Sequence, residues 1–204
     1  MVTGIIKATL RAAVEGAIWR SDETEARLER CGSVDISSGA IVAMDGSLPD
    51  DAAAVTVPVD ASGRFSAWGI DYLGEIGCSG FLLKDDIRLE TDRHGSPVFF
   101  HGDGEDEPIG EALLTIEHVA DLDIEAASFT LLDKAAYDAM GEEERRRVAW
   151  SRYTEMAVAD GGCDPQDSDR ILRYLHLGTG GDGCLDVYGI RYGDEAVGAF
   201  VACC

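Results

Sequence analysis

The stretch from Ser33 to about Phe100 constrains the fold of this chain most strongly. Its apolar residues recur at the two-residue period of a β-strand, in short runs that polar turns separate at regular spacing. Pro58 cannot donate to a β-ladder, so its segment is expected at the edge of a sheet or at the end of a strand. The expected strands cover residues 34–36, 40–44, 55–59, 64–70, 81–83, 87–89 and 97–100.

Helical patterns flank this region. Ile6, Leu10, Val14 and Ile18 form one stripe on a helix that is predicted over 5–19, and a second helix is predicted over 22–30. Asp133 has the character of an N-cap. We expect a helix from residue 134 that has a candidate break at Gly141 and ends at Asp160-Gly161-Gly162, and a short helix from 165 or 168 to 175.

The C-terminal part reads as a β-hairpin. Two apolar segments, 184–192 and 196–202, flank a turn at 193–195, and strands are also expected at 113–119 and 127–132. The return segment of the hairpin is almost entirely apolar, which favours a strand buried in the sheet. The predicted fold is therefore a single α+β domain over 1–204, with helices packed on a mostly antiparallel, curved sheet.

The charge of the chain restricts its partners. Lys and Arg total 17 against 39 Asp and Glu, which gives a formal net charge of -22. Such a surface repels nucleic-acid phosphates and anionic lipid, so direct nucleic-acid and membrane binding are not expected. A basic protein partner would instead be attracted.

Two observations predict a cytoplasmic protein. The apolar residues near the N-terminus are interrupted by Lys7, Arg11 and Glu15, so no signal peptide forms, and no apolar run is long enough for a membrane helix. The chain is long enough to fold without disulfides, so reduced thiols are expected. Its six cysteines are Cys31, Cys78, Cys163, Cys184, Cys203 and Cys204.

The segment 178–183 matches the glycine pattern of a dinucleotide-binding loop, but its context does not fit. Such a loop follows a strand and opens a helix, whereas here a helix is expected before it and a strand after it. We interpret the segment as a glycine-rich turn. Asp182 within it, together with the nearby Tyr188 and His176, is the candidate ligand-binding set.

No cofactor and no metal-ligand set is predicted. The four histidines lack the spacing of a zinc site, and the acidic segments 103–107 and 160–169 lack the spacing of a Ca²⁺ loop. His118 is interpreted as a core histidine and His176 as the end of a short helix. Motifs of the usual nucleophiles are also missing.

Three segments resemble a known bacterial family. They are the serine-glycine, strand and Asp pattern at 35–45, the strand ending on Asp133, and the Gly181-Asp182-Gly183 hairpin with its return strand at 197–201. Together they are similar to the domain of unknown function numbered 4241. The resemblance implies a bacterial cytosolic α+β protein and no settled activity.

Two hypotheses of function follow. The first is a non-catalytic acidic binding protein, comparable to an immunity or inhibitor protein, that engages a basic protein partner. The second is a small-ligand-binding protein or hydrolase with a site near the 178–183 turn. A deep pocket holding Asp182, Tyr188 and His176 would favour the second hypothesis, and a flat acidic surface the first.

Overall fold

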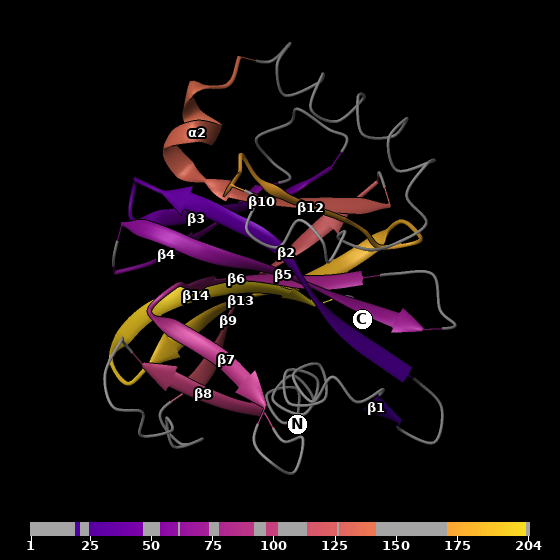
Figure 1. The fold of residues 1–204 in the computed structure, drawn as a ribbon. Coiled ribbons are helices and arrows are strands. Elements are labelled where there is room, and N and C mark those ends of the chain that lie inside the picture. The colour runs from indigo at the N-terminus through magenta and orange to yellow at the C-terminus, as the bar shows by residue number, and fades with distance from the viewer. Residues whose placement is uncertain are drawn as a thin grey trace.

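Two β-sheets packed face to face form most of the structure, which is a computed structural model (Figure 1). The residues it describes are 19–20, 25–46, 54–60, 62–73, 78–91, 97–101, 114–125, 127–141 and 171–202. The larger sheet has the strand order β1-β2-β5-β6-β14-β13-β9, and β11 joins it by a short parallel pairing with β2. Its strands are β1 (Trp19–Arg20), β2 (Glu25–Ile36), β5 (Gly63–Leu73), β6 (Cys78–Lys84), β9 (Leu114–Ile124), β11 (Ile171–Leu172), β13 (Gly183–Tyr192) and β14 (Glu195–Ala202).

The smaller sheet has the order β12-β10-β3-β4, with every pairing antiparallel. The edge position of β4 and the place of Pro58 as its last residue confirm the sequence prediction for that proline. The strands of this sheet are β3 (Ala40–Asp45), β4 (Ala54–Pro58), β10 (Ser128–Asp133) and β12 (Leu175–Gly178). A separate hairpin pairs β7 (Ile87–Thr91) with β8 (Pro97–His101).

The main core lies between the two sheets. Successive residues of a strand point to opposite faces, so alternate side chains of each strand enter this core. Val187 and Ala199 of the larger sheet pack there with Phe129 and Leu177 of the smaller one. Two further apolar clusters lie on the outer faces of the two sheets. The three apolar clusters therefore occupy three separate layers.

The outer clusters have different covers. On the smaller sheet, Tyr137 and Met140 at the short helix α2 (Lys134–Ala139) pack on Val42 and Leu132. On the larger sheet, Ile87 at the start of β7 joins an aromatic cluster around Phe81, Tyr188 and Phe200. Figure 1 accordingly shows α2 and the β7–β8 hairpin on opposite sides of the molecule.

The prediction of an α+β fold with packed helices is wrong. The described residues are mostly β, and α2, at six residues, is the one helix among them. Burial in paired strands outweighs local helix preference, because propensity is a weak prior that tertiary context overrides. The helix predicted over 5–19 lies outside the described residues except for Trp19, which is in β1. The helix predicted from residue 134 is described only to residue 141, where it forms α2, and the rest of it lies outside the described residues.

From Glu25 onward, β2 takes the place of the helix predicted over 22–30. This strand pairs with β5 from Glu25 to Ile36, with a bulge between Arg30 and Gly32. Gly32 has φ 139°, a backbone conformation that glycine adopts far more easily than other residues. Gly32, which follows shortly after the end of the predicted helix, therefore marks a bulge in a long strand.

The prediction of a short helix that ends at Leu175 is also wrong for its described residues, 171–175. Residues 171–172 form β11, and Leu175 begins β12, which pairs with β10. The 178–183 turn consequently lies between two strands. The C-terminal hairpin is confirmed: β14 is buried between β6 and β13, as its apolar sequence predicts.

Candidate functional site

The outer face of the larger sheet carries a polar cluster where β9 and β13 pair. Along this face, three cross-strand pairs follow one another at the edge of the sheet, because β9 is the last strand of the order. The pairs are Cys184 with Asp123, Asp186 with Asp121, and Tyr188 with His118.

A β-bulge brings His118 and Asp121 to the same face. Residues three apart on a regular strand point to opposite faces. Here the register shifts by one between Val187 and Tyr188, so that Val119 has no opposite residue and the alternation is reset. Such bulges re-aim side chains, often beside functional sites.

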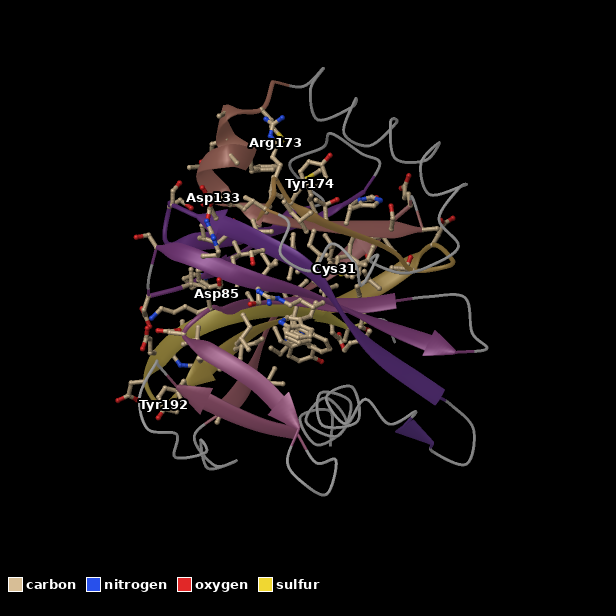
Figure 2. The ribbon with its side chains drawn as sticks, viewed as in Figure 1. Cys31, Asp85, Asp133, Arg173, Tyr174 and Tyr192 are labelled. Carbon is tan, nitrogen blue, oxygen red and sulfur yellow. The ribbon has the colours of Figure 1, made fainter. Side chains whose placement is uncertain are left out.

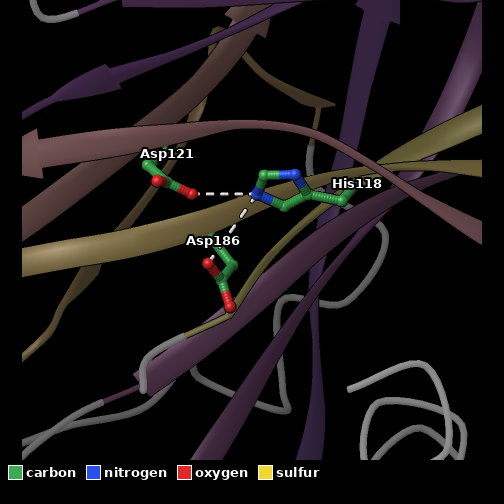
Figure 3. A group of neighbouring side chains, drawn as sticks. All are labelled: His118, Asp121 and Asp186. Carbon is green, nitrogen blue, oxygen red and sulfur yellow. Dashed lines mark hydrogen bonds and ion pairs between the residues drawn. The ribbon is translucent and has the colours of Figure 1, made fainter. Parts of the chain in front are cut away.

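The imidazole of His118 lies between two carboxylates (Figure 3). Its Nε2 is 2.9 Å from Oδ1 of Asp121 and 3.8 Å from Oδ1 of Asp186. His118 and Asp121 are exposed, and the Asp186 side chain is 28% exposed. The three potential ligand atoms all lie within 4.8 Å of one another.

Tyr188 contacts two members of this group, His118 and Asp186. Its ring packs on Phe200 at a centroid distance of 6.1 Å and meets the His118 ring edge to face at 5.3 Å. Its hydroxyl donates to Oδ2 of Asp186 over 2.9 Å. Tyr188 is 3% exposed, so the polar cluster is attached to the aromatic cluster by a buried, rigid side chain.

Within its own two strand segments, the cluster carries more acidic than basic side chains. Asp121 and Asp186 are directly opposite each other, an arrangement of like charges that destabilises a sheet. Neither Leu114–Glu125 nor Asp182–Ile190 contains a Lys or Arg. His118 is therefore the one side chain of these two segments that can carry positive charge between the two carboxylates.

Cys184 ends this row as an exposed free thiol. Local desolvation raises the pKa of Cys184, and a hydrogen bond to Asp123 and the charges of Asp123, Asp121 and Asp186 raise it further. A raised pKa keeps the thiol protonated, which makes it a poor nucleophile and a poor metal ligand.

The structure does not bring the predicted ligand-binding set together. Tyr188 lies on the outer face of the larger sheet, whereas His176 lies on β12 in the smaller sheet, with its Nδ1 2.8 Å from Oγ1 of Thr130. Its neighbours Leu175 and Leu177 enter the main core, so His176 faces the opposite side of the sandwich from Tyr188. Asp182 is exposed in the turn between β12 and β13.

Two other interpretations of single residues are wrong. His118 is 48% exposed in its side chain, so it is not a core histidine. Cys31, whose position is shown in Figure 2, is disulfide-bonded rather than reduced. Sequence distance cannot show that a second cysteine comes close to Cys31 in the fold.

Sequence reasoning also missed the His118, Asp121 and Asp186 group. The separation of three between His118 and Asp121 excludes a shared face unless the strand is bulged, and Asp186 is distant in sequence. A bulge depends on how β9 pairs with β13, so no local pattern signals it. A different, shallow depression at Asp35, Ser37 and Arg64 is wide open, and its Asp35 and Arg64 already pair with each other at 3.3 Å.

Comparison with known proteins identified no similar protein. No protein-family model matches the chain, and neither a curated protein nor a solved structure matches it. The resemblance of the three short segments to the bacterial family therefore stays a prediction. In the described part of the chain, no helix has both the length and the apolar character needed to cross a membrane.

Proposed function

We propose that this protein is a non-catalytic binding protein whose acidic edge engages a basic protein partner. The acidic edge consists of Glu117, Asp121, Asp123 and Glu125 on and after β9, with Asp186 on β13. The observation that carries the proposal is the position of these carboxylates on and just after β9, the last strand of the larger sheet, and on the adjacent β13, in two segments without Lys or Arg.

The physical case rests on charge and geometry. Glu117, Asp121, Asp123 and Glu125 are exposed, so their field reaches into solvent over a Debye length of about 8 Å at physiological ionic strength. A complementary basic surface would be steered to this edge, which raises the association rate more than it raises affinity. The charges also disfavour pairing with an acidic strand, including the same edge of a second copy.

The second hypothesis, a ligand site or hydrolase at the 178–183 turn, has no supporting observation. The residues that would form its site lie on opposite faces of the sandwich or in the exposed turn. A cytoplasmic location also stays part of the proposal. The disulfide at Cys31 does not favour it, because disulfides persist mainly in oxidising compartments.

The test is a pull-down with the tagged protein at low and high salt, followed by work with the purified captured protein. The double variant Asp123→Asn/Glu125→Gln removes two charges of the acidic edge. The matched control, Asp35→Asn/Asp138→Asn, removes two exposed charges elsewhere, on β2 and α2.

We expect a basic protein that is retained at low salt and released at high salt. Its association rate constant, measured by stopped flow, should fall several-fold for the acidic-edge variant and stay near the wild-type value for the control. Equal loss with both double variants would show that only net charge matters. That result, or the absence of a basic partner, would overturn the proposal.

A further inference from the structure

We propose that His118, Asp121 and Asp186 bind a divalent transition-metal ion such as Zn²⁺ or Mn²⁺ on the outer face of β9 and β13. The site shares Asp121 and Asp186 with the acidic edge, but the two proposals are tested separately, because the partner experiment alters Asp123 and Glu125, which are not among the three ligands.

The donor set selects the class of ion. One imidazole nitrogen with two carboxylates suits the borderline ion Zn²⁺, whereas Mg²⁺ and Ca²⁺ prefer oxygen ligands alone. Mn²⁺ is a harder ion, for which the two carboxylates are the main ligands. Three protein ligands also leave at least one coordination position for water or an outside group. The presence of His118 distinguishes this group from an ordinary acidic surface patch.

The distances are close to those of a coordination sphere. Ligands about 2.0–2.2 Å from a tetrahedral Zn²⁺ lie roughly 3.3 Å from one another. The separations from Nε2 to the two aspartate oxygens, 2.9 and 3.8 Å, bracket that value. The two carboxylate oxygens lie within 4.8 Å of each other as well, so the side chains would have to rotate to complete the site.

The arrangement of these ligands destabilises the sheet in two ways. The bulge at Val119 interrupts the ladder of β9 and β13, and the carboxylates of Asp121 and Asp186 lie directly opposite each other. A bound cation would turn this repulsion into attraction. It would also replace the unequal contacts of His118 Nε2, at 2.9 Å from Asp121 and 3.8 Å from Asp186, by shared coordination with both aspartates.

Tyr188 has the role of a positioning residue. Its hydroxyl holds Oδ2 of Asp186, which leaves Oδ1 facing His118, and its ring packs against the imidazole. Partners of this kind orient metal ligands, and their loss typically weakens metal affinity about 10- to 100-fold.

The first measurement uses the wild-type protein and needs no variant. Mn²⁺ is paramagnetic and broadens NMR signals of nearby nuclei. At substoichiometric Mn²⁺, the ring signals of His118 should broaden well before those of His176, which lies on the far side of the sandwich. Equal broadening of both rings would indicate diffuse counter-ions and would overturn the proposal.

The second measurement is Zn²⁺ titration calorimetry on His118→Ala, Asp186→Asn and Tyr188→Phe. We expect at least about tenfold weaker binding for each. The matched control is Glu117→Gln, which removes a charge from the same strand next to His118 but on the other face, and it should keep wild-type affinity. If His118→Ala binds Zn²⁺ as tightly as the wild type, the site is not the one proposed.

Discussion

Ser38 and Asp133 are 95 positions apart in the sequence and are joined by two hydrogen bonds. The backbone N–H of Ser38 and its hydroxyl both donate to Oδ1 of Asp133, over 3.1 and 2.5 Å, while the Ser37 hydroxyl donates to Oδ2 over 2.6 Å. Asp133 (Figure 2) therefore stabilises the short connection through which the chain passes from β2 in one sheet to β3 in the other.

Replacing Asp133 should destabilise the protein in a pH-dependent way. Burial alone would raise the pKa of Asp133, but the hydrogen bonds from Ser37 and Ser38 outweigh it and lower the pKa below its usual 3.8. The unfolded chain then takes up the proton first, so the stabilisation is present at neutral pH and is lost as the pH falls below about 4. Urea unfolding of Asp133→Ala at pH 7 should show a loss of about 2 kcal/mol, which shrinks in acid.

The control for this prediction is Asp138→Asn. Asp138 is exposed and pairs with Lys134 at the helix surface, so its loss should cost less than about 0.5 kcal/mol. If both variants lost the same stability, or if the Asp133 effect did not depend on pH, the assigned role of Asp133 would be wrong.

Lys84 should contribute stability with the opposite pH dependence. Hydrogen bonds to Asp86 at 2.7 Å and to Glu195 at 2.8 Å raise the pKa of Lys84 above 10.5. Because the pKa of Lys84 is higher in the folded than in the unfolded chain, charged Lys84 contributes its full stabilisation below pH 10.5. The contribution disappears as the pH rises through the pKa of the folded state. Lys84→Met should cost about 1 kcal/mol at pH 8 in chemical unfolding, because the pair is partly exposed. A stability difference that does not shrink as the pH rises above 10.5 would contradict this.

Gly198 should tolerate no side chain. A Cβ at this position of β14 would meet the carbonyl oxygen of Leu82 on the neighbouring strand. We expect Gly198→Ala to cost about 3 kcal/mol or more, or to prevent folding, as measured by thermal unfolding. Gly183→Ala is the control, because a Cβ there has nothing within 4 Å and should change stability little.

Deleting Val119 should preserve the polar cluster. The deletion removes the residue without an opposite partner, so β9 and β13 become a regular ladder with His118 still opposite Tyr188. We expect stability within about 1 kcal/mol of the wild type and a retained NMR contact between the His118 and Tyr188 rings. Loss of this ring contact in a folded variant would show that the bulge is placed elsewhere.

Cys184 should react slowly with iodoacetamide at neutral pH. Its raised pKa keeps the thiol protonated, and Asp123 is one of the groups that raise it. Asp123→Asn should therefore increase the alkylation rate of the Cys184 peptide, followed by mass spectrometry, and Asp35→Asn should not. An unchanged alkylation rate in Asp123→Asn would show that the Asp123 carboxylate does not raise the pKa of Cys184.

Much of the strand pattern could be predicted from sequence, because alternation of apolar residues is a local property. The hairpin of β13 and β14 and the edge position of Pro58 were predicted in this way. The helices expected at 22–30 and from 165 or 168 to 175 are strands in their described parts, because pairing with β5 and β10 stabilises strands whose local sequence favours helix.

The sequence by itself determined the charge of the chain, the apolar alternation of its strands and the turn at 178–183. Tertiary structure alone decided that Ser37 and Ser38 donate to Asp133 and that Tyr188 and His176 are separated by the sandwich. It alone also placed His118 beside Asp121 and Asp186. The reason is physical: which face a side chain takes depends on the register of pairing, and a single bulged residue, Val119, reverses that face.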